Sequence, residues 1–177
     1  RRQREMWIKD RPDNLQAAID LTKKRCRERS RVNLHLVISH RHRRELNTIE
    51  QDLFSQGKAS VLIPEHEDEH AYNCVAGTQI SGTCTSKKII NGAFYEVINI
   101  VPLENKDTLT DEIIDCTAEL LSENTSLAWA VVYNKAQGIT IQNKVTCLHD
   151  MQSKHFRRNH LYVGLSRVTN GCDIRVR

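Results

Sequence analysis

The sequence predicts a layered α/β domain with a parallel sheet core that carries a small antiparallel β insertion. Helix-like and strand-like segments alternate over residues 13–57, and they return in the last third of the chain. Between them, residues 58–103 consist of short branched runs separated by glycines. Alternation of helices and strands is typical of α/β proteins. A chain of 177 residues fits one compact domain with a modest insertion.

The first three elements are a helix, a strand and a second helix. Residues 13–29 carry apolar side chains at a helical period, and Asp13 is a candidate N-cap. Residues 32–39, VNLHLVIS, are short and rich in branched side chains, which predicts a buried strand. Residues 40–57 predict a helix that ends at Gly57. Its expected apolar face is formed by Leu46, Ile49, Leu53 and Phe54.

The middle of the chain predicts a small antiparallel sheet or barrel. The Asn91-Gly92 pair lies between KKII and AFYEVINIV, and this is the strongest hairpin signal in the sequence. After it, residues 104–112 lead back to the α/β domain, with Thr110 or Asp111 as the cap of a following helix.

The last third predicts four more elements. Residues 126–135 form an apolar run that we expect to be helical at its start, and residues 144–150 predict a strand. Residues 157–168 predict a helix, and the chain ends with a strand over CDIRVR. We therefore assign residues 1–57 and 111–177 to the α/β domain, and residues 58–110 to the insertion.

Cysteine and histidine spacing gives no support for a metal site. The six cysteines are widely spaced and form no CxxC or CxxH pair, and the eight histidines are scattered over basic and acidic stretches. We expect no bound metal and an intracellular protein with free thiols. The sequence does not determine the compartment, and the nucleus and a site of viral replication stay open. No apolar run approaches the length of about 20 residues that spans a bilayer. The chain begins with Arg1, and we read it as a piece of a longer polypeptide.

Positive charge gathers at the N-terminal end. The net charge is only +4, yet residues 1–44 contain RRQR, KKRCRERSR and HRHRR. Such a segment is typical of proteins that bind phosphate-bearing partners, although a solvated helix face gives the same pattern. The acidic stretch EHEDEH at residues 65–70 fits a solvated loop, and no clustered acidic or Cys/His set supports a nuclease or metal enzyme.

Two short phrases stand out near the C-terminal end. In NKAQGITI, Gly138 permits a tight turn, Gln137 offers both a donor and an acceptor, and Lys135 supplies a positive charge. In RNHLYVGLSRV, Arg167 stands at the end of the predicted helix. It either forms a surface ion pair or presents a permanently charged fork of donors to a phosphate.

Taken together, the two phrases resemble motifs of superfamily 1 helicases in the RecD and PIF (petite integration frequency) group. LAWAVVYNKAQGITI is similar to motif V, and LYVGLSRV is similar to motif VI. LVISHRHRRELNTIE and VAGTQISGTCTSKKIINGAFYEVINI resemble, in order, an early strand and helix and the inserted barrel of the second RecA-like domain. The resemblance covers residues 32–177, and the Arg2-Gln3 pair is a candidate for motif IV.

The resemblance implies a RecA-like fold that contributes residues to an ATP-binding site. In such helicases, ATP lies between two RecA-like domains, and motif VI supplies an arginine finger to the γ-phosphate. That catalytic role falls on Arg167, with Tyr162 and Ser166 as neighbours that position it. Gln137 and Gly138 are expected to approach the γ-phosphate.

The resemblance also implies a track for single-stranded DNA. Its expected residues are Asn134, Lys135, Thr140, His40, Arg41 and Arg43. Where the family's motif V has His, Ser and Thr or Ser, this chain has Asn134, Ala136 and Val132, so the nucleic-acid contact departs from the family pattern.

The sequence has no G-x-x-x-x-G-K-[ST] phosphate cradle. ATP and Mg²⁺ are therefore expected to be held mainly by an N-terminal RecA-like domain, and this chain alone should not hydrolyse ATP. The resemblance predicts the C-terminal motor domain of an ATP-dependent DNA helicase with 5′-to-3′ polarity. The alternative is a non-catalytic module that binds single-stranded nucleic acid through the small barrel and basic residues such as Arg41, Arg43 and Arg44.

Overall fold

The structure is a computed structural model in which the chain forms two compact units. One unit comprises the residues up to Arg43 together with Val131–Arg177, and we call it the parallel unit; Arg44–Ala130 form the antiparallel unit. The structure describes residues 15–25, 32–67, 69–86, 88–101, 103–108, 110–141, 144–170 and 173–177. The predicted cap Asp13 and the Arg2-Gln3 pair lie outside these ranges. The combination of a parallel and an antiparallel sheet confirms the predicted fold class.

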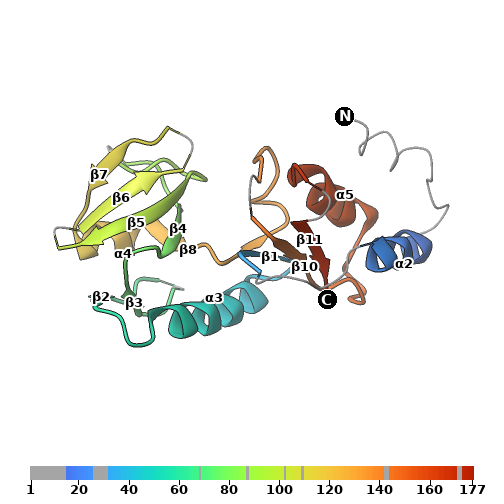
Figure 1. Cartoon of the computed structure of the whole chain (residues 1–177), viewed down its shortest axis with the longest axis horizontal. Coiled ribbons are helices and arrows are strands. Elements are labelled where there is room, and N and C mark those ends of the chain that lie inside the picture. Colours follow the sequence, from blue (N-terminus) through green and yellow to red (C-terminus); the bar gives the residue numbers. More distant parts are fainter. Residues whose placement is uncertain are drawn as a thin grey trace. The chain divides into compact units, whose positions relative to one another are not determined.

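The parallel unit is built on a four-stranded sheet in the order β11-β10-β1-β9 (Figure 1). Its strands are β1 (Leu34–Val37), β9 (Ala130–Val132), β10 (Thr146–Leu148) and β11 (Ile174–Val176). β10 lies between β1 and β11 and runs parallel to both. All residues of β1, β9 and β10 are buried, which is typical of parallel strands covered on both faces.

Two helices of the parallel unit, α2 (Leu15–Arg25) and α5 (Arg158–Arg167), were expected from the sequence. α5 approaches β10 closely at Gly164, where a Cβ atom would lie 2.6 Å from Cδ2 of Leu148. A larger residue at this position would therefore push α5 away from the sheet. The glycine fixes the distance at which the C-terminal end of α5 is held.

The helix α3 (His40–Ser55) forms where predicted, but the face that it buries is not the predicted apolar face. Ile49 and Leu53 are 53% and 60% exposed, whereas Asn47 and Gln51 are buried. The two amides are buried because they bond to neighbouring groups; for example, Oε1 of Gln51 accepts from Nε1 of Trp129 at 2.8 Å. Apolar periodicity does not detect a face that is held by hydrogen bonds. Leu46 and Phe54 are half-buried, in line with the prediction, and the ring of Phe54 lies 4.8 Å from that of Trp129.

The antiparallel unit contains a hairpin and a five-stranded sheet. The hairpin pairs β2 (Val61–Ile63) with β3 (Tyr72–Cys74). The sheet has the order β7-β6-β5-β4-β8 (Figure 1). Its strands are β4 (Gln79–Gly82), β5 (Phe94–Ile100), β6 (Leu103–Asp107), β7 (Ile113–Asp115) and β8 (Thr125–Leu127), with α4 (Ala118–Asn124) before β8. The core of this unit includes Ile63, Ile80, Tyr95, Val97 and Leu121.

The hairpin predicted at Asn91-Gly92 has the turn but not the expected partner strand. Gly92 has a φ of 81°, and the amide of Ala93 donates to the carbonyl of Ile90 at 3.1 Å. Residues 88–90, the described part of KKII, are not in a strand, however, and β5 pairs with β4 instead. The pattern identified a real turn, but the segment before it is part of a longer loop.

Two further expectations about this region are wrong. Neither Thr110 nor Asp111 caps a helix, because α4 begins at Ala118 and Thr117 Oγ1 accepts from the amide of Leu120 at 3.1 Å. The run at residues 126–135 is not helical at its start, since it contains the end of β8 and then β9. A short apolar run has no periodicity that separates a buried strand from a buried helix.

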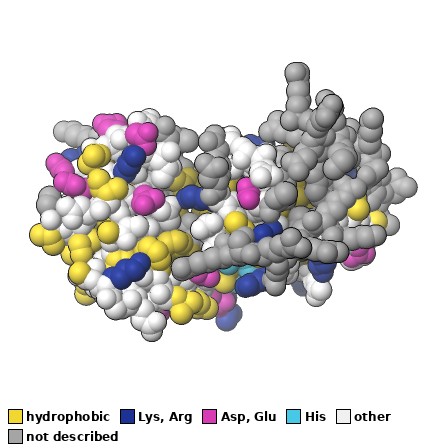
Figure 2. Space-filling view, in the orientation of Figure 1, with side chains coloured by type: hydrophobic (Ala, Val, Ile, Leu, Met, Phe, Trp, Pro, Cys, Tyr) yellow, Lys and Arg dark blue, Asp and Glu magenta, His cyan; other side chains and the backbone are white. Residues whose placement is uncertain are grey.

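Several large hydrophobic side chains of the antiparallel unit are exposed: Leu62, Ile90, Val101 and Ile113. Figure 2 shows hydrophobic side chains interspersed with charged ones on the described surface. Within the ranges that the structure describes, no helix is both long enough and apolar enough to cross a bilayer.

Candidate functional site

In the loop that follows β9, buried residues alternate with exposed polar ones. Tyr133 is buried, and its hydroxyl donates to the carbonyl of His149 at 3.0 Å. Ala136 is also buried, whereas Gln137 and Gly138 are exposed. Gly138 has a φ of +82°, and an added Cβ would meet nothing within 4 Å. The backbone conformation, rather than a lack of space, therefore favours glycine at this position.

The C-terminal end of α5 is joined directly to this loop. The amide of Ile141 donates to the carbonyl of Arg167 at 2.8 Å, and the amide of Thr169 donates to the carbonyl of Ile141 at 3.2 Å. These bonds form a parallel bridge between Ile141 and Val168. Figure 1 shows the loop after β9 beside α5. The two phrases that the sequence analysis singled out are thus brought together, although the bonded residues Ile141 and Arg167 are 26 positions apart.

Arg167 is half-buried and its guanidinium is held by its neighbour. Nε and Nη2 each donate to Oγ of Ser166 at 3.1 Å, and that hydroxyl donates to the carbonyl of Val163 at 3.3 Å. In the described part of the chain, Arg167 forms no ion pair with a carboxylate. A guanidinium that no carboxylate neutralises remains available to a phosphate. The predicted neighbour Tyr162 is 69% exposed on α5.

The residues predicted for the nucleic-acid track have different surroundings. Asn134, Thr140, His40 and Arg41 are exposed, and Lys135 is half-buried. Arg43 is only 8% exposed, so most of its side chain is not accessible to a partner. Asn134, Lys135 and Thr140 belong to the loop that is joined to α5. His40 and Arg41 start α3, which follows the carboxyl end of β1.

A buried histidine pair lies in the same unit, and sequence reasoning did not find it. Nδ1 of His35 and Nε2 of His149 are 2.8 Å apart, which is a hydrogen bond. Next to them, Asp150 accepts from the amide of Ile38 at 2.8 Å and pairs with Nδ1 of His42 at 2.9 Å. Burial is the main cause that lowers the pKa of both His35 and His149 to about 4.

This histidine pair should make the chain less stable in acid. The unfolded chain binds a proton at each histidine with the ordinary pKa of 6.5, whereas the folded chain does so only near pH 4. The free energy of unfolding should therefore fall as the pH is lowered from 6.5 towards 4, by up to about 1.4 kcal/mol for each pKa unit that one histidine is shifted. Urea unfolding midpoints at a series of pH values, in buffer that contains a chelator, measure this slope.

The variant His35→Gln should flatten the slope in part, because one of the two titrating groups and its electrostatic effect on His149 are removed. The matched control is His155→Gln, since His155 is exposed and should leave the slope unchanged. An equal slope in the wild type and His35→Gln would contradict the assignment.

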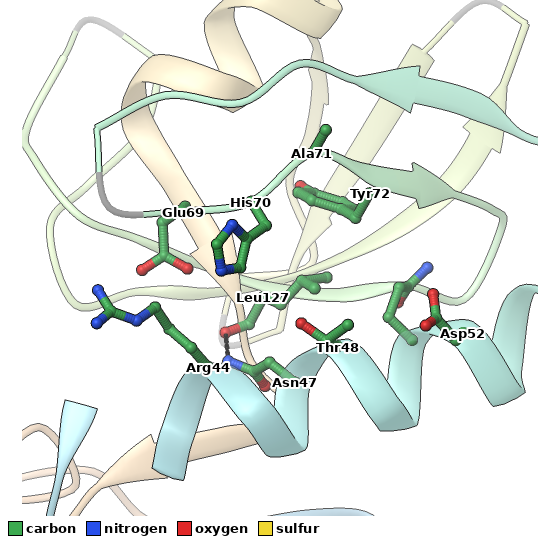
Figure 3. A pocket seen from close by; sticks show the side chains of 10 residues that line it. Arg44, Asn47, Thr48, Asp52, Glu69, His70, Ala71, Tyr72 and Leu127 are labelled. Atoms are coloured by element: carbon green, nitrogen blue, oxygen red, sulfur yellow. Dashed lines mark hydrogen bonds between the residues drawn. The ribbon is translucent and has the colours of Figure 1, made fainter. Parts of the chain in front are cut away.

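The antiparallel unit has a small pocket of its own, between α3 and the β2–β3 hairpin (Figure 3). Figure 3 shows the side chains of Arg44 and Glu69 at one end and Asp52 at the other, with Asn47 bonded to the carbonyl of Leu127. The pocket is lined by Arg44, Asn47, Thr48, Gln51, Asp52, Glu69, His70, Ala71, Tyr72 and Leu127. Arg44 is one of the basic residues that the alternative, a non-catalytic nucleic-acid-binding module, would use.

The fold has well-defined relatives among solved structures. Over 91% of its length, the chain superimposes on 45% of a Pif1 helicase from Bacteroides bound to single-stranded DNA, with a TM-score of 0.65 and 17% identity. A Pif1 helicase from Candida albicans matches 93% of this chain over 50% of its own, with a TM-score of 0.59 and 16% identity. A Bacteroides Pif1 structure with ADP-AlF3 and single-stranded DNA gives a TM-score of 0.62 at 17% identity, again over 91% of this chain and 45% of that one.

The chain therefore has the fold of about half of these helicase structures. At 16–17% identity, the likeness shows the fold and leaves the activity to be argued from the residues. No protein-family model and no curated protein matches the sequence.

Proposed function

We propose that the chain is the C-terminal motor domain of an ATP-dependent DNA helicase with 5′-to-3′ polarity. In this proposal, Arg167 is the arginine finger, and the loop from Asn134 to Thr140 couples the nucleotide to single-stranded DNA. The observation that carries the proposal is the hydrogen bond from the amide of Ile141 to the carbonyl of Arg167, because it holds the end of α5 against that loop.

The chemistry of the site suits the γ-phosphate of a nucleotide. As ATP is hydrolysed, charge develops on the oxygens of the transferred phosphoryl group, and a guanidinium stabilises that charge. Among the residues that the structure describes, Arg167 is held by the neutral hydroxyl of Ser166, which it can leave without breaking an ion pair. Gln137 and Gly138 offer an amide side chain and an accessible backbone at the same end of the unit. ATP and Mg²⁺ are held mainly by an N-terminal RecA-like domain, which is the proposed partner of this chain.

The proposed DNA track consists of polar and basic side chains that are at least partly exposed. They are Asn134, Lys135, Thr140, His40 and Arg41. Arg43 is left out of the proposal because its side chain is buried. The similar Pif1 structures were solved with single-stranded DNA and with ADP-AlF3, which supports both ligand classes for this fold.

The division into a motor domain (residues 1–57 and 111–177) and an insertion (residues 58–110) stays part of the proposal. β7 and β8 follow residue 110, yet they belong to the same antiparallel sheet as most of the insertion. The sheet therefore extends beyond the proposed boundary at residue 110.

The chain on its own should bind single-stranded DNA without hydrolysing ATP. Binding by phosphate contacts should weaken as the salt concentration rises, because counterions are released from the DNA. Fluorescence anisotropy with a labelled oligonucleotide over a salt series measures the binding, and a phosphate-release assay with the same DNA measures turnover. Robust ATP turnover by this chain alone would contradict the proposal that an N-terminal RecA-like domain holds most of the ATP site.

A further inference from the structure

We propose that His35, Cys147 and His149 form a binding site for one Zn²⁺ ion, or a similar divalent transition metal, within the parallel unit. The three side chains are buried, and their potential ligand atoms all lie within 4.8 Å of one another. Two imidazole nitrogens and one thiolate are ligands that zinc prefers. This site is independent of the proposed helicase activity.

Strand register places the three side chains on one face of the sheet. His35 of β1 is the direct partner of Cys147 of β10, and the two strands are parallel. His149 is two residues beyond Cys147, so its side chain points to the same face. The amide of His149 still bonds to the carbonyl of Leu36 at 2.9 Å, which keeps it in line with the strand. Backbone hydrogen bonds therefore fix the strand positions that carry the three proposed metal-ligand side chains.

The protonation states suit a metal. A metal ligand must be a neutral imidazole, and an ordinary imidazole, with a pKa of about 6.5, is already mostly neutral at pH 7. One of the two facing nitrogens, Nδ1 of His35 or Nε2 of His149, carries the proton of their hydrogen bond; on metal binding this proton would move to the other nitrogen of the same ring, so that both facing nitrogens offer a lone pair to the ion. Cys147 would lose its own proton on binding, so its negative charge would offset part of the ion's charge.

The two imidazole nitrogens require only a small adjustment, whereas the sulfur of Cys147, which lies within 4.8 Å of the histidine ligand atoms, would have to move closer by up to about 1.3 Å. Zinc binds nitrogen at about 2.0–2.1 Å and sulfur at about 2.3 Å, so ligand atoms around a tetrahedral ion lie about 3.3–3.6 Å apart. The two histidine nitrogens, now 2.8 Å apart, would separate by about half an ångström. Rotation of the imidazole rings about their side-chain bonds can supply this shift.

The surroundings contain both favourable and unfavourable charges. The positive charge of Arg177 acts on both histidines and opposes a cation. The favourable charge is that of Asp150, which pairs with His42, whose ring is 5.4 Å from that of His149. Because Asp150 also accepts from the amide of Ile38, a metal at His149 would stiffen the segment between β1 and α3. The proposed DNA residues His40 and Arg41 follow that segment directly.

The test is a Co²⁺ titration of the untagged 177-residue chain under reducing conditions. One Co²⁺ per chain should bind, with a thiolate-to-cobalt charge-transfer band, and Zn²⁺ should displace it. X-ray absorption of the zinc-loaded chain should show one sulfur and two imidazole nitrogens in the first shell. The variant Cys147→Ser should lose the charge-transfer band, whereas the controls Cys84→Ser and Cys26→Ser/Cys172→Ser should retain it.

Three outcomes would overturn the proposal, and the first two need no variant. They are a wild-type titration without a charge-transfer band, and a zinc shell of nitrogen and oxygen alone. The third is a band that persists in Cys147→Ser and disappears in Cys26→Ser/Cys172→Ser, because the ion would then lie elsewhere.

Discussion

Replacement of Arg167 by alanine in the full-length protein should lower kcat for DNA-stimulated ATP hydrolysis by about 10³–10⁵-fold. An arginine finger stabilises charge that develops only in the transition state, so its loss affects turnover far more than the binding of ATP. Affinity for single-stranded DNA should remain within a few-fold of the wild type, because Arg167 is bonded to Ser166 and not to the DNA track. Steady-state ATPase assays and DNA-binding assays on the same preparation measure the two quantities.

Two further variants test whether the loss of turnover is specific to the guanidinium of Arg167. Arg167→Lys keeps the charge but loses the planar fork of donors, and it should recover only a small part of the rate. Lys154→Ala removes an exposed positive charge from the same unit and should leave kcat unchanged. If Arg167→Ala hydrolyses ATP at the wild-type rate while Arg41→Ala loses DNA binding, the rival non-catalytic binding module is the better account.

The second large effect concerns Asn47, whose side chain holds the segment between β8 and β9 against α3. Nδ2 of Asn47 donates to the carbonyls of Leu127 and Ala130 at 2.8 and 3.2 Å, and Oδ1 accepts from the amide of Ala130 at 2.6 Å. Asn47→Leu keeps a similar volume but removes all three bonds. It should lower the free energy of unfolding by about 2–4 kcal/mol, because buried backbone groups lose their partners.

Urea unfolding followed by circular dichroism measures this loss. Thr48→Ala is the matched control, since Thr48 is the next residue on α3 and is exposed. Its free energy of unfolding should change by no more than about 0.5 kcal/mol. If Asn47→Leu were as stable as the wild type, apolar packing rather than these hydrogen bonds would hold α3.

The elements that the sequence predicted well are those with a strong local signal. β1, β10 and β11 are short branched runs next to polar segments, and α5 follows a helical period. The errors arose where the deciding contact is distant in sequence. β8 and β9 read as a helix because a buried apolar run has no alternation, and the polar face of α3 is explained only by its partners around residues 127–130.

In the candidate site, too, the sequence carries local signals but does not show contacts between distant segments. Arg167 and Gln137 became candidate site residues because each lies in a phrase with a recognisable order, and their roles stay predictions. The contact that joins them, from Ile141 to Arg167, is a backbone hydrogen bond between distant segments, so side-chain identity alone did not predict it. The cluster of His35, Cys147 and His149 was missed because its spacing is unlike that of CxxC sites. A Cys-x-His pair on a predicted strand, beside a histidine on another predicted strand, was the available signal.

The most direct measurement of the central claim is a crystal structure of the full-length protein with single-stranded DNA and ADP-aluminium fluoride. The guanidinium of Arg167 should leave Ser166 and lie about 2.7–3.1 Å from a fluoride that replaces a γ-phosphate oxygen. Gln137 should lie on the same side of the nucleotide. A guanidinium that still bonds to Ser166, in a site where no residue of this chain contacts the aluminium fluoride, would contradict the account.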